Sequence, residues 1–465
     1  MPSLIAYGAL LMWPLVALGL FLAMPYRRAI VWTILAGYLL LPTSTSFDPP
    51  GVPSLNKDSL PALAAFVLAF CFAPKGHFRW PKSVVVNVLM ALCVLAPVLT
   101  AVTNKDFLVV GSTMRPGMTW YDAVASSAGT VFMLMPFLLG AGFLRDETRH
   151  RDILKIFVTA ASFYSILILW EIRFSPNLEM SIYGVGGDFF VQQMRGNGFR
   201  SKAFLGHGLL VSTFCAMAIV AAIGLVREKQ KLFGVSAAFF VIYLSAILVI
   251  NKSAGALLIA LMICPLFYWF KPKRFVAMAL IAAAMIVSYP ALRGVGLVPV
   301  QQIVSIANSY SPDRAESLGF RVVNEDMLLN RAAERPWFGW GGYGRNRVFV
   351  VADWGQTLDI TVTDGTWIIL IGTLGWIGYF AEFGLLCYPF WHAFKVRHKG
   401  LSVASTALAA VHLINLIDLI PNSSLRPITW LIAVALSGAV ATRRSAAVPG
   451  FAARRAASQP VAHST

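Results

Sequence analysis

The sequence predicts an all-α polytopic integral membrane protein with about 12–13 transmembrane helices and a large helical periplasmic loop. Three observations support this fold class. Of 465 residues, 58% are hydrophobic and 13% are charged, whereas soluble domains average about 45–50% and about 25%. Mean hydropathy is +0.70, and the apolar residues form long runs separated by small basic groups. Soluble cores could not hide so many apolar residues, so an ordinary soluble enzyme is excluded.

Thirteen apolar stretches approach the length of about 20 residues that a helix needs to cross the hydrocarbon core. They lie at 3–23, 28–43, 59–74, 83–103, 123–144, 152–171, 207–226, 231–250, 253–270, 274–291, 365–391, 401–420 and 425–442. The second and third are short, so the number of spans stays open by one or two.

Basic residues indicate the orientation, because short Lys/Arg-rich connections stay in the cytoplasm. Every second connection is of this kind: Arg27 and Arg28; Lys75, Arg79 and Lys82; Arg145, Arg149 and Arg151; Arg227, Lys229 and Lys231; Lys271, Lys273 and Arg274; Lys395, Arg397 and Lys399; and the tail with Arg443, Arg444, Arg454 and Arg455. We therefore expect a multi-pass membrane protein with its N-terminus outside and its C-terminus in the cytoplasm. The same topology explains the net charge of +17 better than nucleic-acid binding does, since no basic stripe occurs.

These patterns divide the chain into four parts. Residues 1–291 hold ten predicted helices and an external loop at 172–206, and residues 292–364 form the large periplasmic loop. Residues 365–442 hold three more helices, and 443–465 are predicted to be a disordered cytoplasmic tail. Within the large loop, Ser311-Pro312-Asp313 predicts a helix start, with the helix running to Glu334.

A glycine-rich segment with aromatic and basic residues follows that helix, from Arg335 to Arg347. Aromatic faces stack on sugar rings, and arginines bind hydroxyls and phosphates. We therefore predict that this segment binds a glycan through five side chains: Arg335, Trp337, Trp340, Tyr343 and Arg345. The alternative is an interfacial aromatic belt.

Metal chemistry is not indicated. The five cysteines lie singly in apolar runs, and the only paired carboxylates in an outer loop, Glu325 and Asp326, are adjacent and should point to different sides of a helix. We expect no metal and no cofactor.

Several motifs occur in a fixed order along the chain. They are Arg200-Ser201-Lys202-Ala203-Phe204-Leu205-Gly206-His207-Gly208, Asn251-Lys252-Ser253-Ala254-Gly255-Ala256, Arg321 upstream of Pro336-Trp337-Phe338-Gly339-Trp340-Gly341, and Asp364-Gly365-Thr366-Trp367 upstream of Gly375-Trp376-Ile377-Gly378. In this order and topology the chain resembles the Wzy-type O-antigen and exopolysaccharide polymerases and the O-antigen ligases of the same superfamily. The ligases usually carry a His where this chain has Asp364, so the comparison favours a polymerase.

The resemblance implies a glycosyltransferase that polymerises oligosaccharide repeat units carried on undecaprenyl pyrophosphate into O-antigen or exopolysaccharide. An anionic leaving group needs Arg or Lys near the outer interface. We predict that Arg200 and Arg321 hold the pyrophosphate and that Asp364 orients or deprotonates the acceptor, with His207 and Glu334 as further candidates for the base. Arg195, Lys202 and Lys252 are predicted substrate contacts.

Purely structural roles are the alternative for these residues. Asp364 could cap the next helix, His207 could bond a loop carbonyl, and the basic loop residues could be solvated. The first alternative function is an O-antigen ligase that transfers glycan to another acceptor. A further one is a lipid-linked oligosaccharide flippase or transporter, for which Glu382 and a His412/Asp418 relay are the candidates, although hydrogen bonding between helices would also explain them. Membrane lipid, a flippase and a chain-length regulator of the same export pathway are the expected partners, and nucleic acid is not.

Overall fold

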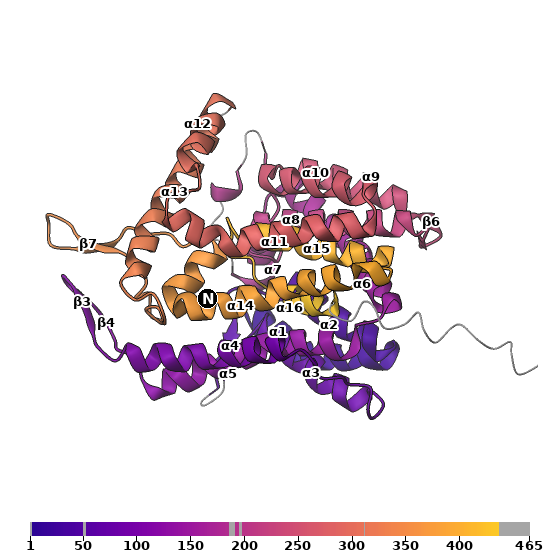
Figure 1. The fold of residues 1–465 in the computed structure, drawn as a ribbon, viewed down its shortest axis with the longest axis horizontal. Coiled ribbons are helices and arrows are strands. Elements are labelled where there is room, and N and C mark those ends of the chain that lie inside the picture. The colour runs from indigo at the N-terminus through magenta and orange to yellow at the C-terminus, as the bar shows by residue number, and fades with distance from the viewer. Residues whose placement is uncertain (1, 50–52, 186–190, 195–197, 311, 437–465) are drawn as a thin grey trace, which may run out of the picture.

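The computed structural model describes residues 2–49, 53–185, 191–194, 198–310 and 312–436. The predicted all-α polytopic fold is confirmed, because helices dominate these residues and strands occur only as short hairpins (Figure 1). Thirteen helices coincide with the thirteen apolar stretches: α1 Leu4–Ala23, α2 Tyr26–Leu40, α3 Ser59–Phe72, α4 Val84–Thr103, α5 Trp120–Phe143, α6 Glu147–Phe174, α8 Gly208–Arg227, α9 Ala237–Ile250, α10 Ala254–Trp269, α11 Pro272–Gly294, α14 Thr366–Val396, α15 Val403–Asp418 and α16 Pro427–Ala435.

Among the described residues, seven of these helices are both long and apolar enough to cross a membrane, namely α1, α4, α5, α6, α8, α11 and α14. The others are shorter, so their assignment as spans stays a prediction. The predicted tail at 443–465 lies outside the described residues.

Local signals in the sequence fix several helix starts. Ser83 accepts a hydrogen bond from the backbone N–H of Val86 at the start of α4, and Thr119 and Asp122 form a capping box at the start of α5. Side-chain oxygens at these positions satisfy backbone N–H groups that have no partner within the helix. These local contacts stabilise the first turn of each helix.

The connections between helices gather at two opposite ends of the bundle. At the first, which we call the loop end, Lys57 Nζ donates to Phe204 O over 2.7 Å, and Asn251 Oδ1 accepts from Ser201 N over 2.8 Å. At the opposite end the predicted cytoplasmic connections meet, for example where Arg151 pairs with Glu228. The alternation of basic and non-basic connections along the sequence thus corresponds to two separate ends of the structure.

The connections at both ends carry elements that the sequence did not predict. Helix α12, Val300–Tyr310, precedes the predicted loop helix, which is α13, Pro312–Ala333, and the two project from the bundle (Figure 1). Helix α7, Leu178–Tyr183, and the short turn η1, Val191–Gln193, lie in the other long loop. Short hairpins are formed by β1 Ser46–Phe47 with β2 Leu55–Asn56, β3 Leu108–Val110 with β4 Thr113–Arg115, β5 Lys231–Leu232 with β6 Val235–Ser236, and β7 Phe349–Val351 with β8 Thr357–Asp359. The 3₁₀ turn η2, Arg397–Lys399, ends α14.

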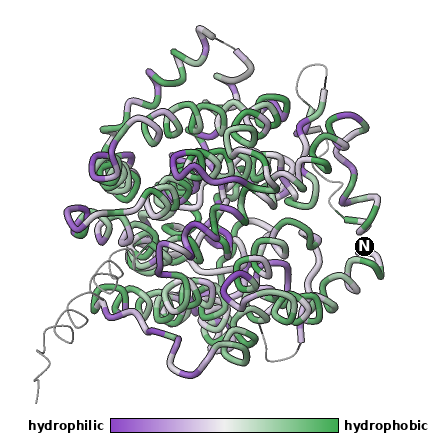
Figure 2. Tube along the Cα trace, turned by 90° about the vertical axis from the view of Figure 1, so that its right-hand side faces the viewer, coloured by the Kyte–Doolittle hydropathy of each residue, from purple (hydrophilic) through white to green (hydrophobic). Residues whose placement is uncertain are grey.

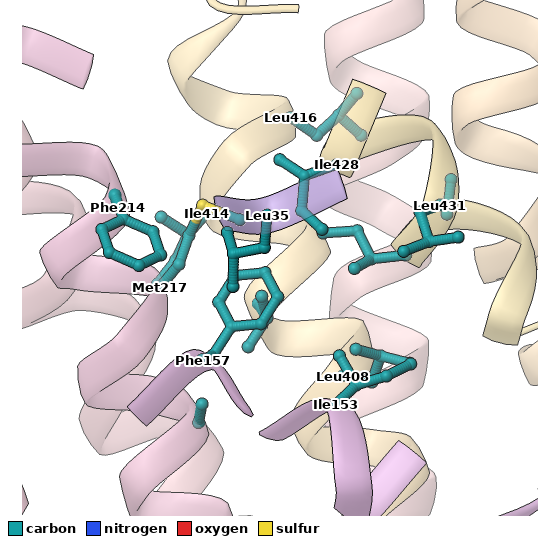
Figure 3. Close-up of a cluster of buried hydrophobic side chains, with 14 of the residues drawn as sticks. Leu35, Ile153, Phe157, Phe214, Met217, Leu408, Ile414, Leu416, Ile428 and Leu431 are labelled. Atoms are coloured by element: carbon teal, nitrogen blue, oxygen red, sulfur yellow. The ribbon is translucent and has the colours of Figure 1, made fainter. Parts of the chain in front are cut away.

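The core is centred on α8, which packs against α6, α9, α10 and α15. Figure 3 shows how Phe214 and Met217 of α8 meet Phe157 of α6 and Ile414 of α15. Hydrophobic residues run along most helices (Figure 2), as expected for helices that face either neighbours or lipid. The N-terminus of α8 is therefore held rigidly at the centre of the loop end.

Helix α14 is broken at Gly375, which has φ 67° and ψ −170°. The segment after α13 lies along this break: Trp340 N donates to Gly372 O over 2.8 Å, and Trp376 N donates to Pro336 O over 2.8 Å. A Cβ on Gly375 would lie 2.4 Å from the carbonyl carbon of Trp337. Only glycine can therefore occupy this position without displacing backbone.

Candidate functional site

The structure brings together two residues that the sequence placed 43 positions apart, Arg321 of α13 and Asp364, which precedes α14. Arg321 Nε lies 3.3 Å from Asp364 Oδ2, and their side chains are 30% and 40% exposed. Arg321 Nη1 also donates to Pro421 O over 3.1 Å. Among the described residues Arg321 Nη2 makes no hydrogen bond, so part of the guanidinium can bind an incoming anion.

The connection between α15 and α16 supports this pair from one side. The backbone N–H of Thr366 lies 3.0 Å from Leu419 O, and Thr366 Oγ1 donates to Asn422 O over 2.9 Å. Asp418, buried at the end of α15, accepts from Asn422 Nδ2 over 2.8 Å. The start of α14 is thus tied to a loop from a different pair of helices.

Asp364 does not cap α14. The cap position is Gly365, which makes no side-chain hydrogen bond to the helix. The carboxylate instead faces Arg321 and solvent, and Arg321 is its only ion-pair partner in the part of the chain that the structure describes. A partly exposed carboxylate beside an arginine can accept a proton or orient a hydroxyl.

Glu171, buried at the end of α6, shapes the second candidate region, residues 200–208. Its Oε2 accepts hydrogen bonds from Ser201 Oγ, Lys202 N and Ala203 N at 2.8, 2.9 and 2.6 Å, and its Oε1 accepts from Leu178 N at 3.0 Å. Ala203 has a φ of +41°. One carboxylate therefore holds the loop that carries the predicted phosphate-binding residues, and no sequence motif identifies it.

The predicted basic residues of this region are buried or serve as structural contacts. Arg200 is 3% exposed, and its Nε donates to Gln193 Oε1 over 3.2 Å. Lys202 is buried, and His207 caps α8 by accepting from Leu209 N through Nδ1 over 3.2 Å. His207 thus has a structural contact, but with a backbone N–H of the helix rather than with the loop carbonyl that the sequence left open. Lys252 lies in the turn between α9 and α10, beside Gly198, and Arg195 lies outside the described residues.

A further charged group at the loop end was missed by the sequence analysis. Arg426, which precedes α16, pairs with Asp58 over 2.9 Å, and the neighbouring Lys57 is buried below the ring of Tyr38. Burial lowers the pKa of Lys57 to about 8, although Asp58 opposes this shift. Lys57 and Arg426 belong to no motif, so their sequence positions do not show that they lie together.

Trp340 does not offer a face to a sugar, contrary to the sequence prediction. Its ring lies under the guanidinium groups of Arg331 and Arg335, at 3.4 and 4.5 Å from the ring centroid, and the residue is 5% exposed. Its Nε1 donates to Arg331 O over 2.8 Å. Trp340 is a packing residue that holds α13 against the break in α14.

Arg335 and Arg345 also hold the loop together rather than facing solvent. Arg335 pairs with Asp106 over 2.9 Å and donates to Asn104 Oδ1 over 2.9 Å. Arg345 is fully buried and donates to Asp106 O and Pro116 O over 2.7 and 2.9 Å. The two guanidinium groups and backbone hydrogen bonding keep the pKa of Asp106 low, against the effect of burial. Substrate binding by these two arginines is therefore not supported by the geometry.

Trp337 and Tyr343 remain available for a glycan. Trp337 is 65% exposed and Tyr343 is 49% exposed. The Tyr343 hydroxyl donates to Asp122 of α5, and this hydrogen bond raises the pKa of the phenol. The predicted glycan-binding segment is thus reduced to two aromatic side chains.

Two further expectations are corrected. Glu325 and Asp326 do not point to different sides, because both contact Arg293 of α11, at 3.7 and 2.6 Å. His412 and Asp418 form no relay in the described residues: His412 Nε2 bonds Leu386 O over 2.7 Å and the ring stacks on Phe390, whereas Asp418 bonds Asn422. Glu334 pairs with Arg331. Among the described residues no group of three or more His, Cys, Asp or Glu could hold a metal ion.

Part of the chain is similar to a known protein family. Residues 238–382 match the family model described as O-antigen ligase. No curated protein and no solved structure matches the chain. The matched segment runs from α9 into α14 and contains Lys252, Arg321 and Asp364. The predicted resemblance to the O-antigen ligase superfamily is thereby borne out over residues 238–382, which are similar to that family in this membrane protein.

Proposed function

We propose that this protein is a membrane glycosyltransferase that polymerises oligosaccharide repeat units, carried on undecaprenyl pyrophosphate, at the periplasmic face of the inner membrane. The observation that carries the proposal is the Arg321–Asp364 pair, which lies inside the matched domain and is open to solvent on one side. A transfer from a lipid diphosphate requires a cation for the leaving group and a base for the acceptor, and this pair supplies both.

The chemistry follows from the two side chains. An acceptor hydroxyl attacks the anomeric carbon of the donor glycan, and the bond between that carbon and the diphosphate oxygen breaks. Asp364 takes the hydroxyl proton, which typically contributes about 10²–10⁴-fold to such a rate. The free N–H groups of Arg321 stabilise the negative charge that develops on the departing diphosphate.

The short basic connections at the opposite end support the orientation, because Lys/Arg-rich connections stay in the cytoplasm. At the loop end, Arg200, Lys202 and Lys57 are buried and Arg426 pairs with Asp58. The proposal therefore assigns the anionic diphosphate of the lipid carrier to Arg321. A flippase that delivers the repeat units and a regulator of chain length are the partners that this reaction would need.

Ligation is the second candidate, and the description of the matched family favours it. A ligase would move finished glycan from the same lipid carrier to a different acceptor. The bonds broken and formed would be almost the same, so only the acceptor distinguishes the two reactions.

Deletion of the gene in its host, with complementation by wild type, Arg321→Ala or Asp364→Asn, tests the proposal. Lipid-linked and surface glycans would be analysed by gel and mass spectrometry. The matched control is Arg347→Ala, since Arg347 and Asp359 form an ion pair of similar exposure in the same loop. We expect both site variants, and not the control, to accumulate single repeat units on the lipid and to lose long polymer.

Each other outcome would change the assignment. Long polymer accumulating on the lipid carrier would establish ligation instead. Repeat units trapped at the cytoplasmic face would point to a flippase. Normal polymer length in both site variants, with each protein inserted in the membrane, would refute the role of Arg321 and Asp364.

A further inference from the structure

Helix α13 is anchored directly behind Arg321. Arg293, buried at the end of α11, lies with its Nη2 2.6 Å from Asp326 Oδ1 and its Nε 3.7 Å from Glu325 Oε2. Its Nη2 also donates to Val322 O over 3.4 Å, and Tyr289 Oη donates to Glu325 Oε2 over 3.3 Å. We call these contacts the Arg293 clasp. They fix the turn of α13 that immediately follows Arg321.

Asn324 connects the same turn to the segment that carries Asp364. Its Oδ1 accepts from Val362 N over 2.7 Å, and its Nδ2 donates to Phe320 O over 2.8 Å. Asn324 is three residues after Arg321, about one helical turn, and Val362 is two residues before Asp364. Asn324 itself is 4% exposed, so its side chain has little contact with water.

We propose that Asn324 and Arg293 are positioning residues for the Arg321–Asp364 pair, with Arg293 fixing α13 on α11 and Asn324 holding the chain before Asp364 against the same helix. This inference rests on the proposed function. Neither Asn324 nor Arg293 contacts Arg321 or Asp364 through its side chain. Arg293 sets the position of Arg321, and Asn324 sets the position of Asp364.

The physical reason is geometric. Arg321 and Asp364 belong to separate segments, and their 3.3 Å contact is itself exposed and worth little alone. Asn324 and Arg293 are both buried, so their contacts are less open to water than the Arg321–Asp364 contact. The supporting contacts, rather than the pair itself, therefore determine the separation of the two reacting groups.

The test uses the purified full-length protein with a lipid-linked repeat unit as donor and measures kcat and KM. Asn324→Ala is compared with Asn330→Ala, an exposed asparagine on the same helix. Glu325→Gln is compared with Glu316→Gln, an exposed glutamate on that helix. We expect Asn324→Ala to lower kcat by about 10- to 100-fold, the loss typical of a misplacement of about 1 Å, while KM for the donor changes less and both controls keep wild-type rates.

A double-mutant cycle separates positioning from general stability. In an Asp364→Glu background, which keeps a carboxylate but shifts it, Asn324→Ala should lower kcat by no more than about threefold further, because coupled residues are not additive. Fully additive losses would overturn the inference. Arg293→Lys gives an independent readout. Lysine keeps the positive charge facing Asp326 but lacks the planar guanidinium that contacts several groups at once. We expect a lowered kcat with a melting temperature close to that of wild type.

Failure of this inference can be told apart from failure of the proposed function. If Arg321→Ala and Asp364→Asn abolish turnover while Asn324→Ala, Arg293→Lys and Glu325→Gln match their controls or wild type, the positioning role is wrong and the site stands. If Arg321→Ala and Asp364→Asn are themselves fully active, the proposed site is wrong and the inference falls with it.

Discussion

Replacing Glu171 by glutamine should destabilise the protein although the two side chains have nearly the same shape. The carboxylate accepts four hydrogen bonds and donates none: three reach Oε2, from Ser201 Oγ, Lys202 N and Ala203 N, and one reaches Oε1, from Leu178 N. Glutamine has one acceptor oxygen. With that oxygen at the Oε2 position, its NH₂ group faces the N–H of Leu178, donor against donor.

The magnitude follows from these four bonds. A buried donor left without an acceptor costs about 1–3 kcal/mol, and hydrogen bonds to a charged acceptor exceed neutral ones by roughly 1 kcal/mol each. Relief of the cost of burying a charge offsets part of this loss. We expect a net destabilisation of about 2–4 kcal/mol for Glu171→Gln, and more for Glu171→Ala, which leaves all four donors unpaired.

Thermal melting of the purified protein in detergent, followed by intrinsic fluorescence, measures the effect. Larger proteins show smaller shifts per kcal/mol, so we expect Tm to fall by about 3–6 °C. Glu316→Gln is the matched control, because Glu316 is exposed on α13. A Tm for Glu171→Gln equal to that of wild type and of the control would refute the reasoning, since it would mean that the carboxylate does not organise residues 201–203.

Three further predictions concern other parts of the chain. Gly375→Ala should lower the free energy of unfolding by about 2–4 kcal/mol, because of the positive φ and the contact with Trp337, and so lower Tm. Gly342→Ala should leave Tm unchanged, because the space around Gly342 is open. Burial lowers the pKa of Lys57 to about 8 in the folded protein, below its unfolded value, so the charge on Lys57 opposes folding at neutral pH. The higher Tm expected for Lys57→Met should therefore approach that of wild type as pH rises from about 7 to about 10. A Tm difference that stays constant over this range would contradict the burial argument. Trp340→Ala should cost about 3–5 kcal/mol, whereas Trp337→Ala should leave Tm within about 1–2 °C of wild type; equal effects in melting experiments would contradict their different exposure.

Helix positions were predictable from sequence because length and apolar character are strong signals that do not depend on tertiary contacts. Helix α12 was not, because its 11 residues mix exposed Ile303 and Ile306 with polar side chains and carry no clear stop signal. The short hairpins lack the length that reveals a strand by alternation. Each of these elements depends on its neighbours for its conformation.

The candidate site was predictable in part. Arg321 and Asp364 were both named as candidates, but nothing in a sequence separation of 43 residues shows that they meet. Trp340 was misassigned because aromatic and arginine residues together are typical both of glycan binding and of internal cation–π packing. Glu171 was overlooked as a functional residue because a single carboxylate at the end of an apolar helix forms no motif, and only the folded chain reveals its four donors.

The break in α14 has a consequence for exchanging loops between related chains. The segment 336–341 forms backbone hydrogen bonds with residues 372–376, on both sides of Gly375. The large loop and the first half of α14 therefore behave as one exchangeable module, although a hydropathy boundary at residue 365 would divide them. Chimeras that join two homologues at 365 would mismatch a backbone interface, so crossovers should be placed beyond Gly378.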